Sequence, residues 1–177
     1  GTHGRLDEAA DLRPNGAGGF VRAARPRVRA LAESGCVYVG FGAESASPAV
    51  LLAMGKGGFM LANGTERVHG FDLPKTMLEG YRNTVDAGLH GNCTWILGYP
   101  GEGLRELQHS AAFIAWQRGL PGMCPEAVNA RMFTATAYPG TDMFRDPKVQ
   151  ARLARGFGLS FGADGQPVTE PITETVT

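Results

Sequence analysis

Apolar and polar positions along the chain follow two periods, one typical of helices and one typical of strands. Helical spacing or helix-capping residues predict helices over residues 20–34, 48–54, 74–87, 104–118 and 147–155. Pro26 must kink or divide the first of them. Short runs rich in β-forming residues predict strands over residues 36–41, 92–98 and 127–137. Because helices and strands alternate, we expect an α/β fold with a parallel sheet, covering helices and right-handed crossovers.

Three stretches show neither period. Residues 1–19 are rich in Gly, charge and turn formers, and residues 158–177 in Gly, Pro, Thr and Glu, so we expect a flexible start, a core domain over 20–157 and a flexible tail. Residues 55–73 are expected to form a long irregular connection, which is usually functional or mobile. Because the first residue is Gly rather than Met, we expect a fragment or a processed or trimmed form.

Charge and glycine content bear on the partners that the chain could bind. Seventeen basic and seventeen acidic side chains cancel, so charge does not favour a nucleic acid or an anionic membrane. Neither a signal peptide nor an apolar run long enough to span a bilayer is evident. Glycine is frequent, at 26 of 177 residues, and falls mainly in loops and strand ends, where a backbone turns or meets a ligand.

Histidine and cysteine spacing predicts no metal site. The candidates are scattered along the chain: His3, Cys36, His69, His90, Cys93, His109 and Cys124. None of them pairs with another at ligand spacing, and three separated cysteines make no disulfide framework. We interpret the cysteines chiefly as small buried hydrophobes in a reducing compartment, which predicts a cytoplasmic protein.

The three predicted strands end in similar Gly-rich segments. These segments are Gly42-Ala43-Glu44-Ser45, Gly98-Tyr99-Pro100-Gly101-Glu102 and Ala137-Tyr138-Pro139-Gly140-Thr141. Parallel strands point the same way, so the segments are expected to converge on one edge of the sheet, where such folds bind ligands. Glu44 and Lys56 offer opposite charges that suit an amino acid zwitterion. The alternative is that Gly and Pro simply make turns.

Motifs over residues 30–145 carry a resemblance to a known family. In chain order they are Gly40-Phe41-Gly42-Ala43-Glu44-Ser45-Ala46-Ser47 continued by Met54-Gly55-Lys56-Gly57, then Ala87-Gly88-Leu89, then Ile96-Leu97-Gly98-Tyr99-Pro100-Gly101-Glu102, then Tyr138-Pro139-Gly140-Thr141. Together they resemble the second half of a radical S-adenosylmethionine (radical SAM) enzyme core. The closest resemblance is to the branch whose members often carry a cobalamin-binding domain. It implies that the sheet is about half of a partial (β/α) TIM barrel.

The resemblance implies a SAM site at the predicted strand ends. Glu44 and Ser45, just after Gly42, match the end of the family's fourth strand, beside the ribose and methionyl part of SAM. A carboxylate there can accept hydrogen bonds from a hydroxyl or an ammonium group. Lys56 matches a basic residue that meets the SAM carboxylate in several relatives.

The remaining implied positions lie on the later strands. Ile96, Leu97 and Gly98 match the fifth-strand motif that packs on adenine, for which an apolar surface and an open backbone edge are suited. Tyr138 lies in the turn that matches the end of the sixth strand, where a shaping role is expected.

One departure limits what the resemblance implies. The family cleaves SAM reductively, beside a [4Fe-4S] cluster, to a 5′-deoxyadenosyl radical used for hydrogen abstraction or radical-type methyl transfer. Three cysteines of a C-x-x-x-C-x-x-C loop hold the cluster, and this sequence contains no such loop. We therefore expect the cluster ligands to lie outside this chain, and the chain alone to be inactive. No catalytic residue is assigned.

Two alternatives remain open from the sequence. One is an iron-independent barrel enzyme that uses the same strand ends on a phosphorylated metabolite. The other is a non-catalytic remnant that serves as a binding or assembly module. Because half a barrel exposes sheet edges and an uncovered face, the second alternative predicts an oligomer or a permanent partner, such as a missing N-terminal half.

Overall fold

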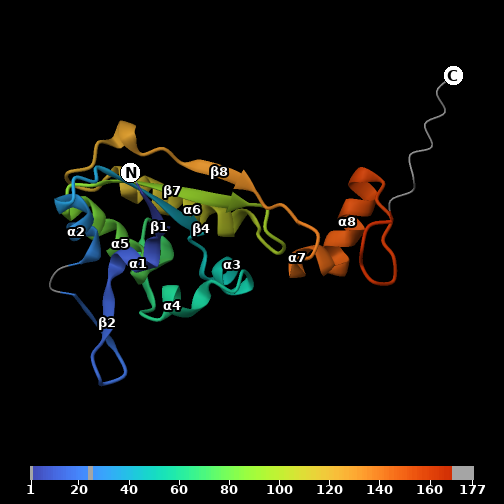
Figure 1. Cartoon of the computed structure of the whole chain (residues 1–177), viewed down its shortest axis with the longest axis horizontal. Coiled ribbons are helices and arrows are strands. Elements are labelled where there is room, and N and C mark those ends of the chain that lie inside the picture. Colours follow the sequence, from blue (N-terminus) through green and yellow to red (C-terminus); the bar gives the residue numbers. More distant parts are fainter. Residues whose placement is uncertain (1, 24–25, 169–177) are drawn as a thin grey trace. The chain divides into compact units, whose positions relative to one another are not determined.

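A computed structural model describes residues 2–23 and 26–168 of the chain (Figure 1). They form two compact units, residues 2–134 and residues 135–168, and each is described by itself. Among the described residues, no helix has the length and the hydrophobicity needed to cross a membrane.

A four-stranded parallel sheet is the centre of the first unit. The spatial order of its strands is β1-β4-β7-β8, which is also the order in which they occur in the sequence. Figure 1 shows these strands side by side. The strands are β1 (Thr2–Arg5), β4 (Tyr38–Glu44), β7 (His90–Leu97) and β8 (Arg131–Thr134). The expected α/β fold with a parallel sheet and covering helices is confirmed.

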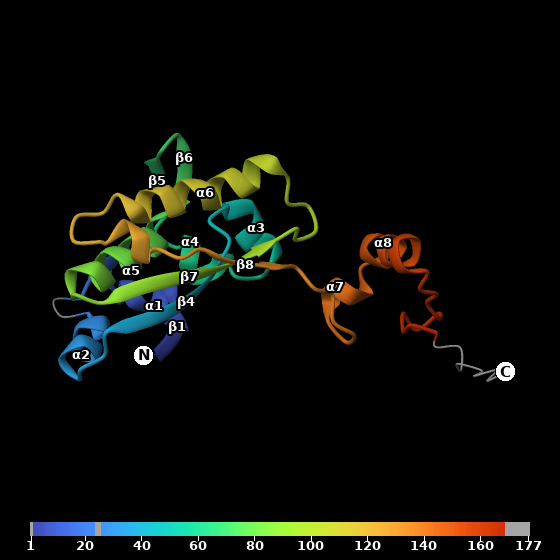
Figure 2. The same ribbon diagram turned by 90° about the horizontal axis from the view of Figure 1, so that it is seen from above.

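Helices cover one face of this sheet, as Figure 2 shows for α1, α5 and α6. The helices of the unit are α1 (Leu6–Ala10), α2 (Arg27–Glu33), α3 (Pro48–Ala53), α4 (Gly57–Leu61), α5 (Lys75–Asp86), α6 (Leu104–Arg118) and the 3-10 turn η1 (Pro125–Ala127). A sheet whose strands follow chain order, with helices on a single face, is built like successive β/α units of a barrel. A doubly wound fold would place helices on both faces.

The core lies between that covered face and the helices. Trp95 on β7 is fully buried and meets Phe113 of α6 edge to face, with ring centroids 5.5 Å apart. Tyr81 of α5 is also fully buried, and its hydroxyl donates a hydrogen bond to the Gly91 carbonyl, 2.7 Å away. These contacts join the two long helices to the central strand β7.

Two expectations at the start of the chain are wrong. Residues 2–14 contain β1, α1 and β2 (Leu12–Pro14) where a flexible start was expected, and residues 20–22 form β3 (Phe20–Arg22) rather than helix. β2 and β3 pair antiparallel across a turn in which Asn15 Oδ1 accepts the N–H groups of Ala17 and Gly19. This pairing overrides the helical spacing, and the helix begins only after Pro26.

The connection over residues 55–73 is also more ordered than expected. It contains α4 and a hairpin of β5 (Thr65–Val68) and β6 (Phe71–Pro74). Both turn residues, His69 and Gly70, have positive φ, which matches the twist of a two-residue hairpin. The third predicted strand, residues 127–137, shortens to β8 at residues 131–134.

The second unit is mostly helical. It holds α7 (Asp142–Arg145), which was not predicted, and α8 (Pro147–Phe157), which confirms the helix expected at 147–155. Thr141 and Asp146 cap these helices through their side-chain oxygens. Phe161 and Pro167 form an isolated bridge in the expected tail, and residues 169–177 of that tail lie outside the described residues.

Candidate functional site

The carboxyl ends of β4 and β7 lie next to each other, and Glu44 ends β4 in an unusual conformation. Gly42 pairs with Thr94, but Glu44 pairs with Trp95, so β4 has one extra residue at its end. Glu44 has φ of +64°, the left-handed region that costs a non-glycine residue about 1 kcal/mol or more. Backbone strain of this kind is concentrated at functional sites.

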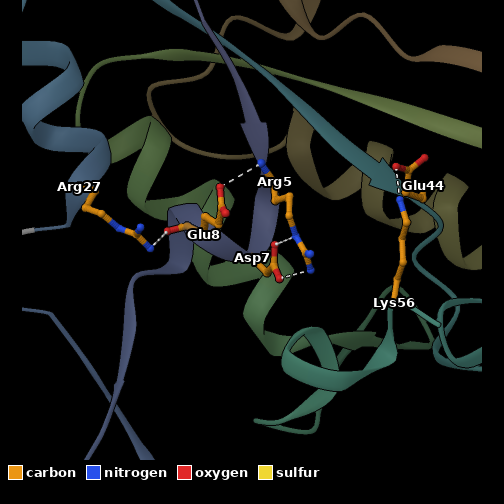
Figure 3. Close-up of polar contacts among 6 residues, drawn as sticks. All are labelled: Arg5, Asp7, Glu8, Arg27, Glu44 and Lys56. Carbon is orange, nitrogen blue, oxygen red and sulfur yellow. Dashed lines mark hydrogen bonds and ion pairs between the residues drawn. The ribbon is translucent and has the colours of Figure 1, made fainter. Parts of the chain in front are cut away.

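An ion pair crosses this strand end, as Figure 3 shows. Lys56 Nζ donates a hydrogen bond to Glu44 Oε1 at 2.5 Å. The Lys56 side chain is 43% exposed and that of Glu44 is 19% exposed, so solutes can reach both groups. The structure therefore brings together two predicted site residues that are twelve positions apart.

The end of α3 determines where Lys56 lies. Gly55 has φ of +68°, its N–H donates to the Leu52 carbonyl, and the Lys56 N–H donates to the Leu51 carbonyl. These two bonds form a Schellman motif, in which the left-handed glycine turns the chain sharply off the helix. The turn sends the Lys56 side chain back toward the end of β4.

Gly42 makes room for the Glu44 carboxylate. A Cβ at position 42 would lie 3.1 Å from Glu44 Oε1, so the carboxylate lies against the bare backbone of Gly42. Because Gly42 is level with Thr94, on the face opposite the buried Cys93 and Trp95, the carboxylate lies on the uncovered face of the sheet.

Ser45 has a supporting position rather than an exposed one. It is fully buried, and its Oγ accepts a hydrogen bond from the Ser47 N–H at 3.1 Å. Next to it, the Ala46 N–H donates to Ser110 Oγ of α6. These bonds hold the loop between β4 and α3 and thereby the position of Glu44.

The end of β7 carries the next predicted residues, and Ile96 and Leu97 there are half-buried. Gly98 follows with φ of +76°, and its N–H donates to Glu102 Oε2 at 2.6 Å. The other carboxylate oxygen, Glu102 Oε1, is buried and has no hydrogen-bond partner among the described residues. Glu102 lies in a predicted Gly-rich segment but had no predicted role; a carboxylate shortly after a predicted strand end was the available signal.

Tyr138 belongs to the second unit and is described with it. Its side chain is 66% exposed, and its carbonyl accepts a hydrogen bond from the Thr141 hydroxyl at 2.7 Å. This bond forms the predicted turn, and the shaping role of Tyr138 stays a prediction.

A second charged group at the end of β1 was not predicted (Figure 3). Arg5 donates two hydrogen bonds to the buried Asp7, at 3.0 and 2.7 Å. The hydrogen bond and the negative charge of Asp7 raise the pKa of Arg5. Nearby, Arg27 donates to the Glu8 carbonyl at 3.1 Å. These bonds hold the turn from β1 into α1.

The cysteines do not fit an iron–sulfur cluster. Cys93 is buried and accepts a hydrogen bond from Gln117, whereas Cys124 is exposed and donates to Glu126. Cys36 is half-buried and donates to the Tyr38 carbonyl. Across residues 2–23 and 26–168, no group of three His, Cys, Asp or Glu side chains could hold a metal ion.

The buried thiol predicts a loss of stability at alkaline pH. Burial raises the pKa of Cys93 from 9.0 to about 12 and also raises the pKa of Tyr81. The native state therefore keeps these protons at a pH at which the unfolded chain loses them. The contribution of Cys93 to the free energy of unfolding is complete below pH 9 and is lost as the pH rises toward 12. Urea unfolding at increasing pH should show the decline. Cys93→Ala should make it shallower and Cys124→Ala should not; an identical slope in both variants contradicts the assignment.

Comparison with known proteins shows a partial likeness to a methyltransferase. No protein-family model matches the chain. Over 117 residues, 66% of the chain, it is 31% identical to a protein of Pyrococcus horikoshii named an uncharacterized methyltransferase. The likeness is to a methyltransferase. The matched stretch is 20% of that protein, so the chain spans about a fifth of the length of this curated relative.

Proposed function

We propose that the chain is the SAM-holding part of a radical SAM enzyme that catalyses radical-type methyl transfer or hydrogen abstraction. The observation that supports this proposal most is the accessible Glu44–Lys56 ion pair on the uncovered face at the end of β4. The motif resemblance and the partial likeness to a methyltransferase support the same cofactor. The activity of the whole enzyme is part of the proposal, because the chain spans only a fifth of that relative.

The site residues suit the methionyl end of SAM. Its α-carboxylate and α-ammonium complement Lys56 and Glu44, so binding exchanges one internal ion pair for two charge-assisted hydrogen bonds to the ligand. Because Gly42 has no side chain, the ligand can come close to the backbone beside the Glu44 carboxylate.

The end of β7 suits the nucleoside end. Ile96 and Leu97 offer half-buried apolar surface to the adenine, and Glu102 Oε1 is a buried acceptor for a hydroxyl or an amino group. Two carboxylates at this edge, Glu44 and Glu102, also favour a ligand that carries a sulfonium charge. In this proposal the residues of the chain bind and orient SAM.

The redox groups come from outside the described residues. SAM bound beside a [4Fe-4S] cluster supplies a 5′-deoxyadenosyl radical on reduction. The cysteines described above do not fit such a cluster, so we assign its ligands, and any bound cobalamin, to parts of the enzyme beyond this chain.

Calorimetric titration of SAM into the purified chain tests the proposal. Wild type should bind SAM, and Glu44→Ala and Lys56→Ala should each weaken binding by about tenfold or more, the cost of one charge-assisted hydrogen bond. Arg67→Ala is the matched control, because it removes an exposed ion pair with Asp72 on the β5–β6 hairpin.

Two outcomes would contradict the proposal. A folded chain that does not bind SAM would leave the non-catalytic module as the better interpretation. Binding that neither site variant weakens would move the SAM site away from the end of β4. In the first case, titration with inorganic phosphate tests the iron-independent alternative.

A further inference from the structure

One row of residues crosses the uncovered face of the parallel sheet and has an arginine at each end. From β1 to β8 its members, each level with the next, are Arg5, Gly42, Thr94 and Arg131, and we call them the arginine row. Level residues of neighbouring parallel strands lie on the same face of a sheet. Since Phe41 and Ala43, on either side of Gly42, are buried against the helices, the arginine row belongs to the opposite face.

The space between the two arginines has a low floor. Gly42 has no side chain, and the small side chain of Thr94 lies toward β4, because its hydroxyl donates to the Phe41 carbonyl at 3.2 Å. Neighbouring strands are about 4.8 Å apart, so three strand spacings place the Cα atoms of Arg5 and Arg131 about 14 Å apart. A small molecule that lies across the strands is thus within reach of both guanidinium groups.

Arg5 uses only one side of its guanidinium inside the protein (Figure 3). Nε and Nη2 donate to the two carboxylate oxygens of Asp7, and the Glu8 carboxylate accepts from the Arg5 backbone N–H. The Asp7 side chain is 3% exposed, whereas that of Arg5 is 58% exposed. Nη1 and the second N–H of Nη2 donate to no group among the described residues. These N–H groups form the end-on fork that matches a carboxylate or a phosphate.

Arg131 is a second cation at the other end of the arginine row. It is exposed, and its side chain makes no hydrogen bond or ion pair with any described residue. Two carboxylates at this edge of the sheet, Asp7 and Glu44, are already paired with Arg5 and Lys56. An anion in the arginine row would therefore meet two cations that still have N–H groups to donate.

We propose that the arginine row binds an anionic group of the substrate, a carboxylate or a phosphate. The end-on fork of Arg5 holds this group, and Arg131 attracts it from the other end of the row. The inference rests on the proposed function, because it takes the bound anion to belong to the substrate of the SAM site. Gly42 links the two sites, since the Glu44 carboxylate lies against its bare backbone. A substrate held in the row therefore lies next to the methionyl end of SAM.

A structural role alone accounts for only part of this geometry. The buried Asp7 needs a cation, and the two hydrogen bonds from Arg5 supply it. That role requires neither an outward-facing fork on Arg5 nor a second arginine level with it across a glycine.

Titration of inorganic phosphate, and separately of succinate, tests the arginine row, with the backbone N–H signals of Gly42 and Thr94 followed by NMR. Wild type should bind at least one probe with millimolar affinity, and the tighter probe distinguishes a phosphate from a carboxylate. Arg5→Lys keeps a cation beside Asp7 but lacks the fork, so the affinity should fall about tenfold. Arg131→Gln should lower it about threefold, as expected for an exposed charge. Arg29→Gln is the matched control, because Arg29 is 64% exposed on α2, and it should change nothing.

A titration with saturating SAM separates this inference from the proposed function. SAM should leave the affinity for the probe unchanged, and Glu44→Ala should weaken the binding of SAM but not of the probe. Anion binding without SAM binding would overturn the proposed function and keep the anion site. SAM binding without anion binding would overturn only this inference.

Two further results would also overturn it. One is an affinity for the probe that Arg5→Lys and Arg131→Gln both leave unchanged. The other is a probe that displaces SAM, since that would place the anion at Lys56. If Arg5→Lys does not fold, Arg131→Gln decides the test, because the exposed Arg131 supports no other described side chain.

Discussion

Gly80→Ala is expected to lower the free energy of unfolding by about 3 kcal/mol, at the upper end for overpacking a buried position. Gly80 is buried in α5, and a Cβ there would lie 2.2 Å from the Leu6 carbonyl oxygen and 3.1 Å from the Ala10 N–H nitrogen. Both atoms belong to the backbone of α1, so no rotamer change can relieve the clash and α1 must move away from α5.

That movement would also break two hydrogen bonds. Asn83, one turn after Gly80, donates to the carbonyls of Ala9 and Ala10 and so satisfies the end of α1. The strain and the lost bonds outweigh the roughly 1 kcal/mol by which alanine favours a helix over glycine.

Urea unfolding measures the effect of Gly80→Ala. Gly58→Ala is the matched control in α4, where a Cβ meets no atom within 4 Å, and it should keep or slightly raise stability. Equal changes in the two variants would show that α1 and α5 are not in close contact.

Trp95→Ala should cost about 4 kcal/mol of stability, the usual range for deleting a buried aromatic side chain. Trp95 is fully buried against the helices. Its edge-to-face contact with Phe113 joins β7 to α6. Since Trp95 is level with Glu44 in the sheet, the cavity would also loosen the strand end that carries the site.

Trp95→Phe separates the contribution of aromatic packing to stability from the cost of burying the indole N–H. The indole Nε1 of Trp95 is buried and donates no hydrogen bond, which carries a desolvation cost of about 1–3 kcal/mol. Phe keeps an aromatic ring beside Phe113 and removes that cost, so the net loss should be about 1 kcal/mol or less. Thermal unfolding of the two variants compares them, and a similar large loss in both would contradict this account.

The long helices could be predicted from sequence because their signals are local. Residues 104–118 were predicted and observed as the same helix, and α5 and α8 each lie within two residues of the expected bounds at either end. Each of these helices has repeated apolar spacing, and α5 and α8 also begin beside a proline and end near a glycine, features that a single segment carries by itself.

The short elements could not be predicted in the same way. β1, β5 and β6 have four residues each, too few to show a period, and they exist because a partner strand satisfies their backbone groups. For the same reason residues 20–22 joined the hairpin with β2 despite a helical spacing that continued toward α2.

Parts of the candidate site could likewise be predicted from the sequence, and other parts could not. The sequence by itself determined the parallel α/β class, the Gly-rich strand ends and the placement of Glu44 and Lys56 near one edge, because the alternation of helices and strands and the helix caps can be recognised from local patterns. Only the tertiary structure decided that the two side chains form an ion pair over Gly42 and that Glu102 Oε1 is left without a partner. It alone also decided that Arg5 and Arg131 lie in one row across the sheet. Those features depend on how separate segments pack, because distances and burial between distant residues are set by packing and not by any one stretch of chain.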